Sequence, residues 1–416
     1  MANTGLSRTF GTPTNNLKWT FSAWIKRSNV TTTQNIFSAR IDGSNFGMIS
    51  INSSGYLDVA SYIGGFEMRY ITNRVFRDAS AWYHIFVSND SSLASPETKI
   101  YINGVLETSF STSDPASQNE ESMINKSGVA HWVGQNGNNQ SYFDGSMSHI
   151  HFTDGYVYDA TAFGEYDANG VWKIKTSPSV TYGTNGFFIL KDGNSVTDQS
   201  TNTNNFTVGG GTLTNTEDSP SNVFATFNPL DVNKGTVTTF SNGNTTVMHN
   251  AGNNGAVTGA RSTLAYSAGK FYWETKCIAT GGDVRTGIIS MSSSDYVNNT
   301  NPYSNNECYT YKQNAIKGSS GQTDVAYGAT YTAGDIIGIA HDVSAGTLTF
   351  YKNGVSQGVA FTGLSTSLFW GAFSSEYNQG KLSYNFGNGY FGTTAVASAG
   401  TNASGIGIFE YDVPTG

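Results

Sequence analysis

Two stretches of the chain share one device, KIYINGV at residues 99–105 and TFYKNGV at residues 349–355. In each, a run rich in aromatic and apolar residues leads into Asn-Gly. Asn-Gly favours a two-residue turn with positive φ at both central positions, and such a turn folds the next strand back antiparallel. The two stretches therefore predict a β-hairpin, and with it an antiparallel β-sandwich, in each half of the chain.

The composition agrees with folded, turn-rich domains. The chain has 416 residues, which is enough for two or three domains of roughly 100 to 200 residues each. Only 12% of the residues are charged, against about 25% in an ordinary soluble domain. Because 13% are aromatic and apolar alternation recurs throughout, sizeable cores can form and disorder is not indicated. We predict an all-β chain of two sandwiches in tandem.

Three segments of the first half read as strands of its sandwich. WTFSAWIKR at residues 19–27 alternates apolar and polar side chains, with Trp24 alone on the polar face, and predicts a strand with one buried face. AWYHIFV at residues 81–87 is apolar on both faces, as expected for a central strand covered on both sides. Residues 144–155 have Asp-Gly at each end and predict the strand that closes this sandwich.

Composition also divides the chain. Residues 209–222 open with three glycines and close with Asp-Ser-Pro, which is typical of a linker. We therefore predict a first domain at residues 1–218, whose aromatic-rich extension from about residue 161 packs back onto the sandwich. A second domain is predicted at residues 221–395, and a C-terminal tail at residues 396–416.

The tail itself contains two kinds of sequence. Residues 392–404 are mostly small and predict a flexible spacer, whereas residues 405–413 supply apolar side chains at Ile406, Ile408 and Phe409. Such side chains seldom stay exposed. We expect this segment to dock in an extended form, either along a sheet edge of its own chain or on a neighbouring subunit.

Each half resembles a known sandwich family. The first half resembles the laminin-G, or concanavalin A-like, jelly roll in three segments, residues 19–27, 81–87 and 99–105. The second half resembles the SPRY sandwich in the order and spacing of four segments, GKFYWE at residues 269–274, YTAGDIIG at 331–338, LTFYKNG at 348–354 and YNFG at 384–387.

Nearly the whole chain also resembles virion proteins of tailed phages from marine bacteria. The motifs that carry this resemblance are WTFSAWIKR (19–27), YFDG (142–145), FGE (163–165), Trp172, YGTNGF (182–187), NNFT (204–207) and FATFNPLD (224–231). The resemblance implies a structural component made in the host cytoplasm and displayed on the particle exterior, on the head or with the tail or its fibres. It also implies contacts with other virion proteins and further copies of the chain, and adhesion to the host surface.

Several partners are excluded by charge and hydropathy. The formal net charge is −8 and no cluster of Lys and Arg occurs, so we expect no grip on nucleic acid. The N-terminus has no apolar core of a signal peptide, and no run of about 18 apolar residues occurs, so we expect no membrane insertion. Cys277 and Cys308 are expected to be buried free thiols.

Catalytic patterns are absent from the sequence. A glycoside hydrolase on a concanavalin A-like fold needs two carboxylates flanking the scissile bond, typically in a Glu-x-Asp-x-x-Glu spacing. Glu165-Tyr-Asp167 and Glu410-Tyr-Asp412 are the nearest approaches, and each lacks the second Glu. We predict that the chain is not an enzyme, with a polysaccharide-degrading activity as the remote alternative.

Histidines and carboxylates supply the candidate metal ligands of the sequence. His149 and His151 alternate along one strand and can point to one face, as in cupins, but Asp154 comes too early for the glutamate that a cupin needs. Asp42 and Asp58 are candidate calcium ligands without a complete Asp-rich loop. We expect no cofactor, with calcium as the one metal left open.

Exposed aromatic residues near sandwich loops can stack on sugars. Trp132, Tyr142 and Phe143 lie in turn-flanked segments and are the candidate ligand-binding residues, although core packing is the commoner fate of such side chains. They leave open an alternative function, a lectin-like protein that recognises a glycan on the host surface.

Overall fold

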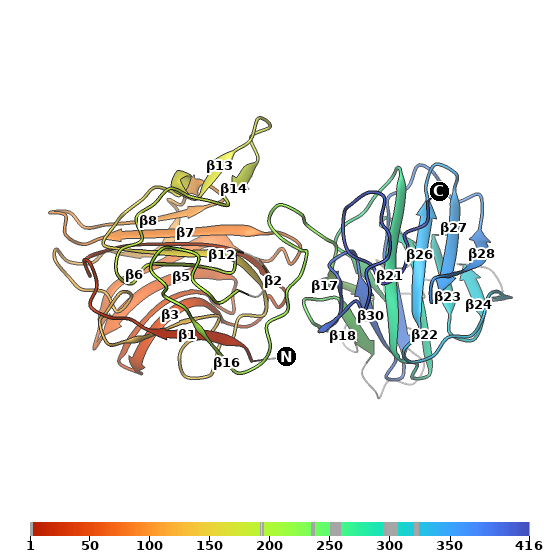
Figure 1. Ribbon diagram of the computed structural model, residues 1–416, viewed down its shortest axis with the longest axis horizontal. Coiled ribbons are helices and arrows are strands. Elements are labelled where there is room, and N and C mark those ends of the chain that lie inside the picture. The colour runs from red at the N-terminus through yellow and green to blue at the C-terminus, as the bar shows by residue number, and fades with distance from the viewer. Residues whose placement is uncertain are drawn as a thin grey trace. The chain divides into compact units, whose positions relative to one another are not determined.

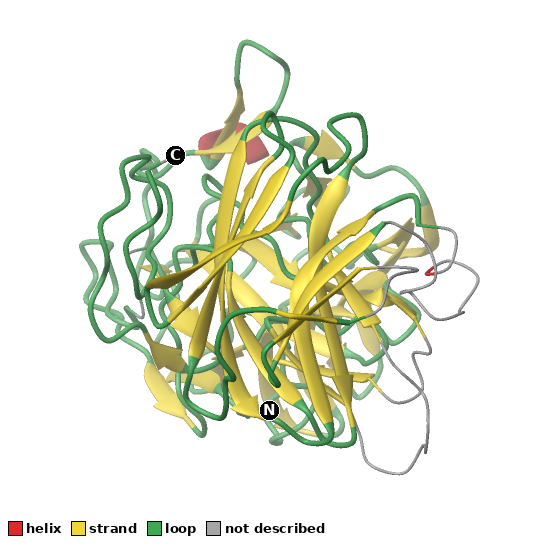
Figure 2. Ribbon diagram, turned by 90° about the vertical axis from the view of Figure 1, so that its right-hand side faces the viewer, coloured by secondary structure: helices red, strands yellow, loops and turns green. Residues whose placement is uncertain are grey.

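The computed structural model describes residues 3–191, 193, 195–233, 238–249, 259–293, 296, 307–319 and 324–415. The chain forms two compact units, one of Met1–Asn215 with Ser219–Ser221 and the other of Thr216–Asp218 with Asn222–Gly416. Each unit has its own apolar core. Nearly all regular structure is antiparallel strand (Figure 1, Figure 2), so the predicted all-β class with two sandwiches in tandem is confirmed.

Two sheets form the first unit in the described part of the chain. The larger has the order β10 (Phe110–Asp114), β6 (Phe66–Val75), β5 (Tyr56–Ile63), β4 (Asn45–Ile51), β3 (Gln34–Asp42), β11 (Ala130–Val133), β1 (Gly5–Thr9), β16 (Thr207–Gly209). The smaller has the order β15 (Phe187–Ile189), β12 (Gly145–Asp154), β2 (Lys18–Arg27), β7 (Tyr83–Asp90), β8 (Glu97–Ile102), β9 (Val105–Leu106). A 3-10 turn and a hairpin complete it, η1 (Ala160–Ala162), β13 (Gly164–Tyr166) and β14 (Trp172–Ile174).

Side chains from the two sheets interlock between them. Phe21 of β2 stacks on Phe37 of β3 at a centroid distance of 5.1 Å, and Phe152 of β12 lies 5.6 Å from the same ring. β12 pairs with both β2 and β15, so the prediction that residues 144–155 close the sandwich is confirmed. β7 is buried along nearly its whole length between β2 and β8, as predicted for residues 81–87.

The outer face of the smaller sheet is covered too, which corrects the prediction of one buried face for residues 19–27. Every residue of β2 after Lys18 is buried. Phe163 and Trp172, from the aromatic extension after β12, pack with Trp24 in a second apolar cluster. Polar residues on this face of β2 are therefore buried beneath the extension, and the predicted packing of the extension onto the first sandwich is confirmed.

The second unit also has two larger sheets among its described residues. One has the order β17 (Phe227–Asn233), β20 (Gly259–Ser262), β29 (Trp370–Tyr377), β22 (Asp283–Ser290), β23 (Cys308–Lys312), β24 (Ile316–Ser319), β25 (Val325–Ala326). The other has the order β18 (Thr238–Ser241), β19 (Thr246–His249), β30 (Lys381–Asn385), β21 (Lys270–Ala279), β26 (Ile336–Asp342), β27 (Thr347–Lys352), β28 (Val355–Phe361). A short pair follows, β31 (Tyr390–Phe391) and β32 (Thr394–Ala395).

Core packing in this unit uses aromatic rings and buried thiols. Trp273, Trp370 and Tyr384 are buried within it. Cys277 and Cys308 are both buried and free, as predicted. No helix among the described residues is long and apolar enough to span a membrane.

The C-terminal residues lie on their own unit. Asn388 and Ile408 form an isolated parallel bridge, and Phe409 is buried with its ring 5.2 Å from that of Tyr272. The buried Glu274 carboxylate accepts hydrogen bonds of 2.8 Å from the backbone N–H groups of Glu410 and Tyr411. Residues 405–413 therefore dock on their own chain, which is the first of the two predicted alternatives.

Both Asn-Gly pairs form the predicted turn. Asn103 and Gly104 have φ of 50° and 76°, and Asn353 and Gly354 have φ of 49° and 79°. Each turn glycine is also covered by an aromatic ring from a later segment. A Cβ atom at Gly104 would overlap the ring of Trp172, and one at Gly354 would overlap the ring of Tyr411. Glycine is thus required twice over, by φ and by the ring above it.

These contacts predict the cost of filling the turns. Gly104→Val and Gly354→Val should each lower the free energy of unfolding of their own unit by about 2 to 5 kcal/mol, the sum of backbone strain and overpacking. Gly64→Val is the matched control in the first unit, because Gly64 has φ of 70° with no atom near its Cβ position. Denaturant unfolding in which Gly104→Val cost no more than Gly64→Val would contradict the packing on Trp172.

A buried acid in the second unit predicts a pH dependence. Glu376 on β29 accepts a hydrogen bond from the Ser374 hydroxyl, and burial raises the pKa of its carboxyl to about 8. Since the pKa is raised in the folded state, this group contributes stability below about pH 4.5 that is lost as the pH rises to about 8.

Glu376→Gln keeps the side-chain shape but cannot ionise. From pH 5 to pH 8 the unfolding free energy of the wild-type second unit should fall relative to this variant by on the order of 1 to 4 kcal/mol. Parallel curves for the two proteins across this range, measured by denaturant unfolding, would show that Glu376 does not titrate as stated.

Candidate ligand-binding cleft

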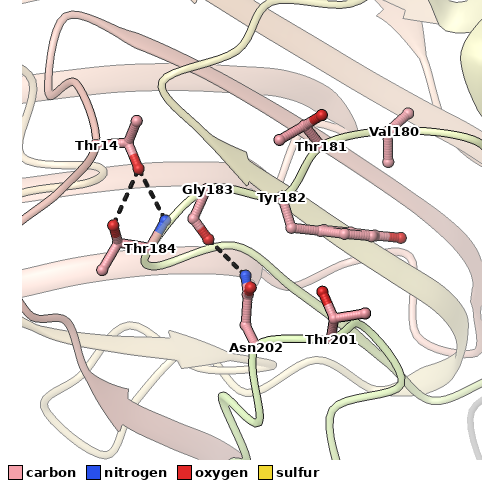
Figure 3. A pocket seen from close by; sticks show the side chains of 8 residues that line it. All are labelled: Thr14, Val180, Thr181, Tyr182, Gly183, Thr184, Thr201 and Asn202. Atoms are coloured by element: carbon pink, nitrogen blue, oxygen red, sulfur yellow. Dashed lines mark hydrogen bonds between the residues drawn. The ribbon is translucent and has the colours of Figure 1, made fainter.

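A cleft of about 530 Å³ opens in the first unit, where three non-strand segments meet (Figure 3). The segments are the connection from β1 to β2, the segment before β15 and the loop after β15. The residues that line the cleft are Thr14, Val180, Thr181, Tyr182, Gly183, Thr184, Thr201 and Asn202. All eight side chains are uncharged types, and five of them carry a hydroxyl group.

The buried carboxylate of Asp154, at the end of β12, positions two walls of the cleft. Its Oδ2 accepts hydrogen bonds from the backbone N–H groups of Thr14 at 2.7 Å and Asn185 at 3.0 Å. Its Oδ1 accepts one from Nδ2 of Asn125 at 2.7 Å and one from the N–H of Asn15 at 3.3 Å. A fully buried carboxylate must be satisfied in this way, so both segments are held to β12.

The walls are also tied to each other. Thr14 Oγ1 accepts a hydrogen bond from the backbone N–H of Thr184 at 2.8 Å and lies 3.0 Å from Thr184 Oγ1. Asn202 Nδ2 donates to the carbonyl oxygens of Gly183 and Gly186 and so links the loop after β15 to the segment before it (Figure 3). Gly183 has φ of 71°, and a Cβ there would overlap the Asp154 carbonyl, so no other residue fits.

Tyr182 supplies the aromatic surface of the cleft. Its hydroxyl and His151 Nδ1 are 2.9 Å apart and share a hydrogen bond. Burial raises the pKa of the Tyr182 phenol, with a further increase from the negative charge of Asp198, and burial also holds the pKa of His151 well below its usual value. Both rings are therefore neutral near pH 7, and the hydrogen bond fixes the Tyr182 ring in place.

Three polar atoms of the lining retain unused hydrogen-bonding capacity. Within the described residues, Thr181 Oγ1, Thr201 Oγ1 and Asn202 Oδ1 take part in no hydrogen bond. Thr181 and Thr201 are exposed, so their hydroxyls are accessible to a ligand. Chemically, the cleft offers hydroxyl donors and acceptors, one amide acceptor and one fixed aromatic ring.

Comparison with known proteins assigns both halves of the chain. Residues 4–159 match the model of the Concanavalin A-like lectin/glucanases superfamily, and residues 270–389 match the model of the SPRY domain. The chain is a concanavalin A-like domain followed by a SPRY domain. Seven of the eight cleft residues lie beyond residue 159, in the extension that follows the matched part of the concanavalin A-like domain.

Curated relatives match a quarter of the chain. Ran-binding protein 9 of Xenopus laevis is 35% identical over 112 residues, which is 26% of this chain and 20% of that protein. The Ran-binding proteins 9/10 homolog of Drosophila melanogaster is 34% identical over 107 residues, 25% of this chain and 11% of that protein. The chain thus spans a fifth or less of the length of these relatives.

Solved SPRY domains are also similar to part of the chain. The SPRY domain of human HERC1 is 17% identical, with a TM-score of 0.32 over 38% of this chain and 96% of that chain. The TRIM65 PSpry domain is 17% identical, with a TM-score of 0.30 over 39% of this chain and 91% of that chain.

The aromatic residues singled out in the sequence lie outside this cleft. Trp132 is half-buried on β11, with the turn glycine Gly137 close to its ring. Tyr142 is half-buried and its hydroxyl lies 3.4 Å from Asn139 Oδ1. Phe143 packs against the main core of the concanavalin A-like domain. None of the three lines the cleft, so they remain separate predictions.

The histidine pair does not follow simple alternation. The pairing of β12 with β2 shifts between Ser148 and His151, and His149 within this irregularity has φ of 48°. His149 Nδ1 lies 2.7 Å from Ser148 Oγ, and both His149 and His151 pack against Phe188, with centroid distances of 5.6 and 3.9 Å. His151 instead takes part in the cleft, by orienting Tyr182.

The candidate calcium ligands already have protein partners. Asp42 Oδ1 accepts hydrogen bonds from the N–H of Ser44 at 2.7 Å and from Asn45 Nδ2 at 3.0 Å. Buried Asp58 forms a two-pronged ion pair with Arg69, at 3.2 Å to Nε and 2.7 Å to Nη2. No group of three or more His, Cys, Asp or Glu side chains among the described residues is arranged to hold a metal ion.

The two carboxylate pairs considered for hydrolysis serve turns and loops. Asp167 accepts hydrogen bonds of 2.9 Å from the N–H groups of Asn169 and Val171. Glu410 and Asp412 accept hydrogen bonds from the N–H groups of Ala397 and Thr401. In the part of the chain that the structure describes, no carboxylate lines the cleft.

Sequence reasoning did not identify the cleft residues as a site. YGTNGF at residues 182–187 and NNFT at 204–207 were informative only as family motifs. The available signal was the concentration of Thr, Asn and Gly around Tyr182. Thr and Asn side chains often hydrogen-bond to nearby backbone groups, and Gly is common in turns. That signal does not show which segments meet, since Thr14 comes from a distant part of the chain.

The Asp154 hub predicts a large effect of a small substitution. Asp154→Asn replaces one acceptor oxygen with a donor group facing N–H groups, and should lower the unfolding free energy of the concanavalin A-like domain by about 2 to 4 kcal/mol. Asp42→Asn is the control, since this exposed Asp caps a turn that Asn also caps, and should change it by about 0.5 kcal/mol or less. Equal effects of both substitutions in denaturant unfolding would contradict the role of Asp154.

Proposed function

We propose that the chain is a non-enzymatic component of a tailed-phage virion, displayed on the particle exterior, that mediates adhesion to the host surface. Domains of these two kinds are generally binding or interaction modules. The virion assignment is supported by the motif resemblance along the chain. The curated relatives described above are animal proteins and share only the smaller part of the sequence.

The two domains have different tasks in this proposal. The SPRY domain attaches the chain to another protein of the particle, or to a second copy. Its support is that SPRY domains are generally binding or interaction modules, and that the chain has relatives whose name, Ran-binding protein, describes protein recognition. Ran itself is not proposed as a partner, because the matched segment is a fifth or less of those proteins. The concanavalin A-like domain faces the host glycan.

The observation that carries the adhesive role is the cleft in the concanavalin A-like domain. It is uncharged, rich in hydroxyl groups and fixed by the buried Asp154 carboxylate. Its hydroxyl groups, its amide and its aromatic ring are groups that can hold a small polar ligand. Among the described residues no carboxylate lines the cleft, and this favours binding over hydrolysis, which needs two.

A lectin-like receptor-recognition protein is the second candidate, and the same cleft favours it. In that function glycan binding is the primary role and display on the particle is secondary. The two candidate functions differ in whether the chain is present on purified particles and in its copy number there. A polysaccharide-degrading enzyme remains the remote alternative.

The test uses the full chain and purified particles. We expect the chain in a fixed copy number on particles by quantitative mass spectrometry, binding of the purified chain to host cells, and no release of reducing ends from host polysaccharide. Cell binding without the chain on particles would favour the lectin-like function. Presence on particles without cell binding would leave a structural role only, and released reducing ends would overturn the non-enzymatic assignment.

A further inference from the structure

We propose that the cleft at Tyr182 is a binding site for a neutral saccharide, a terminal sugar unit whose hydroxyl groups bond to Thr181, Thr201 and Asn202. This inference rests on the proposed glycan-facing role of the concanavalin A-like domain and names its site and ligand class. The site belongs to the extension after residue 159, beyond the part of the domain that the family model matches.

Size and shape fit a small ligand. The cleft volume of about 530 Å³ lies within the range of about 300 to 1,000 Å³ found for small-molecule sites. Tyr182 extends between the segment that carries Thr181 and the loop that carries Thr201 and Asn202 (Figure 3). A sugar ring presents an apolar C–H face and a rim of hydroxyl groups, and the cleft presents an aromatic side chain with polar atoms on both sides of it.

Charge selects a neutral ligand. None of the described lining side chains is charged, and Tyr182 and His151 are both neutral near pH 7. Asp198, whose negative charge raises the pKa of Tyr182 in addition to burial, disfavours an anion nearby. An acidic sugar or a phosphate would thus lose hydration without gaining a cation from the lining, whereas the hydroxyl groups of a neutral sugar find matching donors and acceptors.

The walls of the cleft are held rigidly, and this favours the affinity of the cleft for a small ligand that makes few contacts. The backbone of Thr14 and Asn185 is held by Asp154, and Asn202 Nδ2 is held by two carbonyl oxygens, so the walls are formed before a ligand arrives. Asn202 Oδ1 is left as an acceptor by that arrangement. Little ordering entropy is then lost on binding.

The test uses the full chain on a glycan array that pairs neutral glycans ending in glucose, galactose, mannose or N-acetylglucosamine with acidic glycans ending in uronic or sialic acid. The best neutral glycan is then titrated calorimetrically. Thr181→Val and Thr201→Val remove one hydroxyl group each with little change in shape, and Thr201→Trp fills the cleft. Thr176→Val is the matched control, because Thr176 is exposed and does not line the cleft.

We expect a neutral glycan to bind the wild type and Thr176→Val equally. Each hydroxyl removal should weaken binding about three- to tenfold, as for one lost hydrogen bond. Thr201→Trp should abolish binding with an unchanged unfolding midpoint, which shows that the domain is still folded.

Each other outcome overturns a specific statement. Neutral-glycan binding that all cleft variants retain would place the site elsewhere while the adhesive function stands. Binding of acidic glycans alone would overturn the ligand class. Binding of host cells but of no glycan on the array would overturn the saccharide site without touching adhesion, and binding of neither would overturn both.

Discussion

A buried carboxylate in each domain holds a late segment of chain against its sandwich, and much of the remaining architecture depends on these two groups. Asp154 accepts four hydrogen bonds from residues far away in the sequence. Glu274 accepts the backbone N–H groups of Glu410 and Tyr411, with further bonds from Tyr272 and Asn385. Desolvation raises the pKa of Glu274, and these hydrogen bonds lower it again in part. A buried carboxylate without hydrogen-bond partners has a high free energy. Detaching either segment would therefore destabilise its domain.

The same device has different consequences in the two domains. In the concanavalin A-like domain, the segments that Asp154 holds are walls of the cleft, so a structural interaction also pre-forms the candidate site. In the SPRY domain, Glu274 holds a C-terminal segment whose Tyr411 ring covers the turn glycine Gly354. There the held segment covers a hairpin of the sandwich.

Local sequence was sufficient for the parts of the fold that depend on local chemistry. Asn103-Gly104 and Asn353-Gly354 form their turns because Asn and Gly tolerate positive φ wherever they occur. The outer face of β2 was predicted incorrectly, because its polar residues are covered by Phe163 and Trp172 from an extension far along the chain.

The cleft was missed for a similar reason. The sequence marks Asp154 as part of an Asp-Gly turn and as an unsuitable metal ligand, whereas its four donors come from three distant segments that the sequence gives no means of bringing together. His149 and His151 alternate in sequence and both rings pack against Phe188, but the alternation alone does not predict the irregularity in β12 between Ser148 and His151. Which side chains are buried, which residues touch across the two sheets and which loops meet all depend on contacts between distant parts of the chain. A single sequence contains little information about such contacts.

The most direct test of the account is a cryo-electron microscopy map of the intact particle in which this chain is located. We expect two sandwich densities per copy on the particle exterior, with the SPRY domain against a neighbouring virion protein and the cleft of the concanavalin A-like domain open to solvent. A map of complete particles without these densities, or with the cleft buried against another subunit, would contradict it.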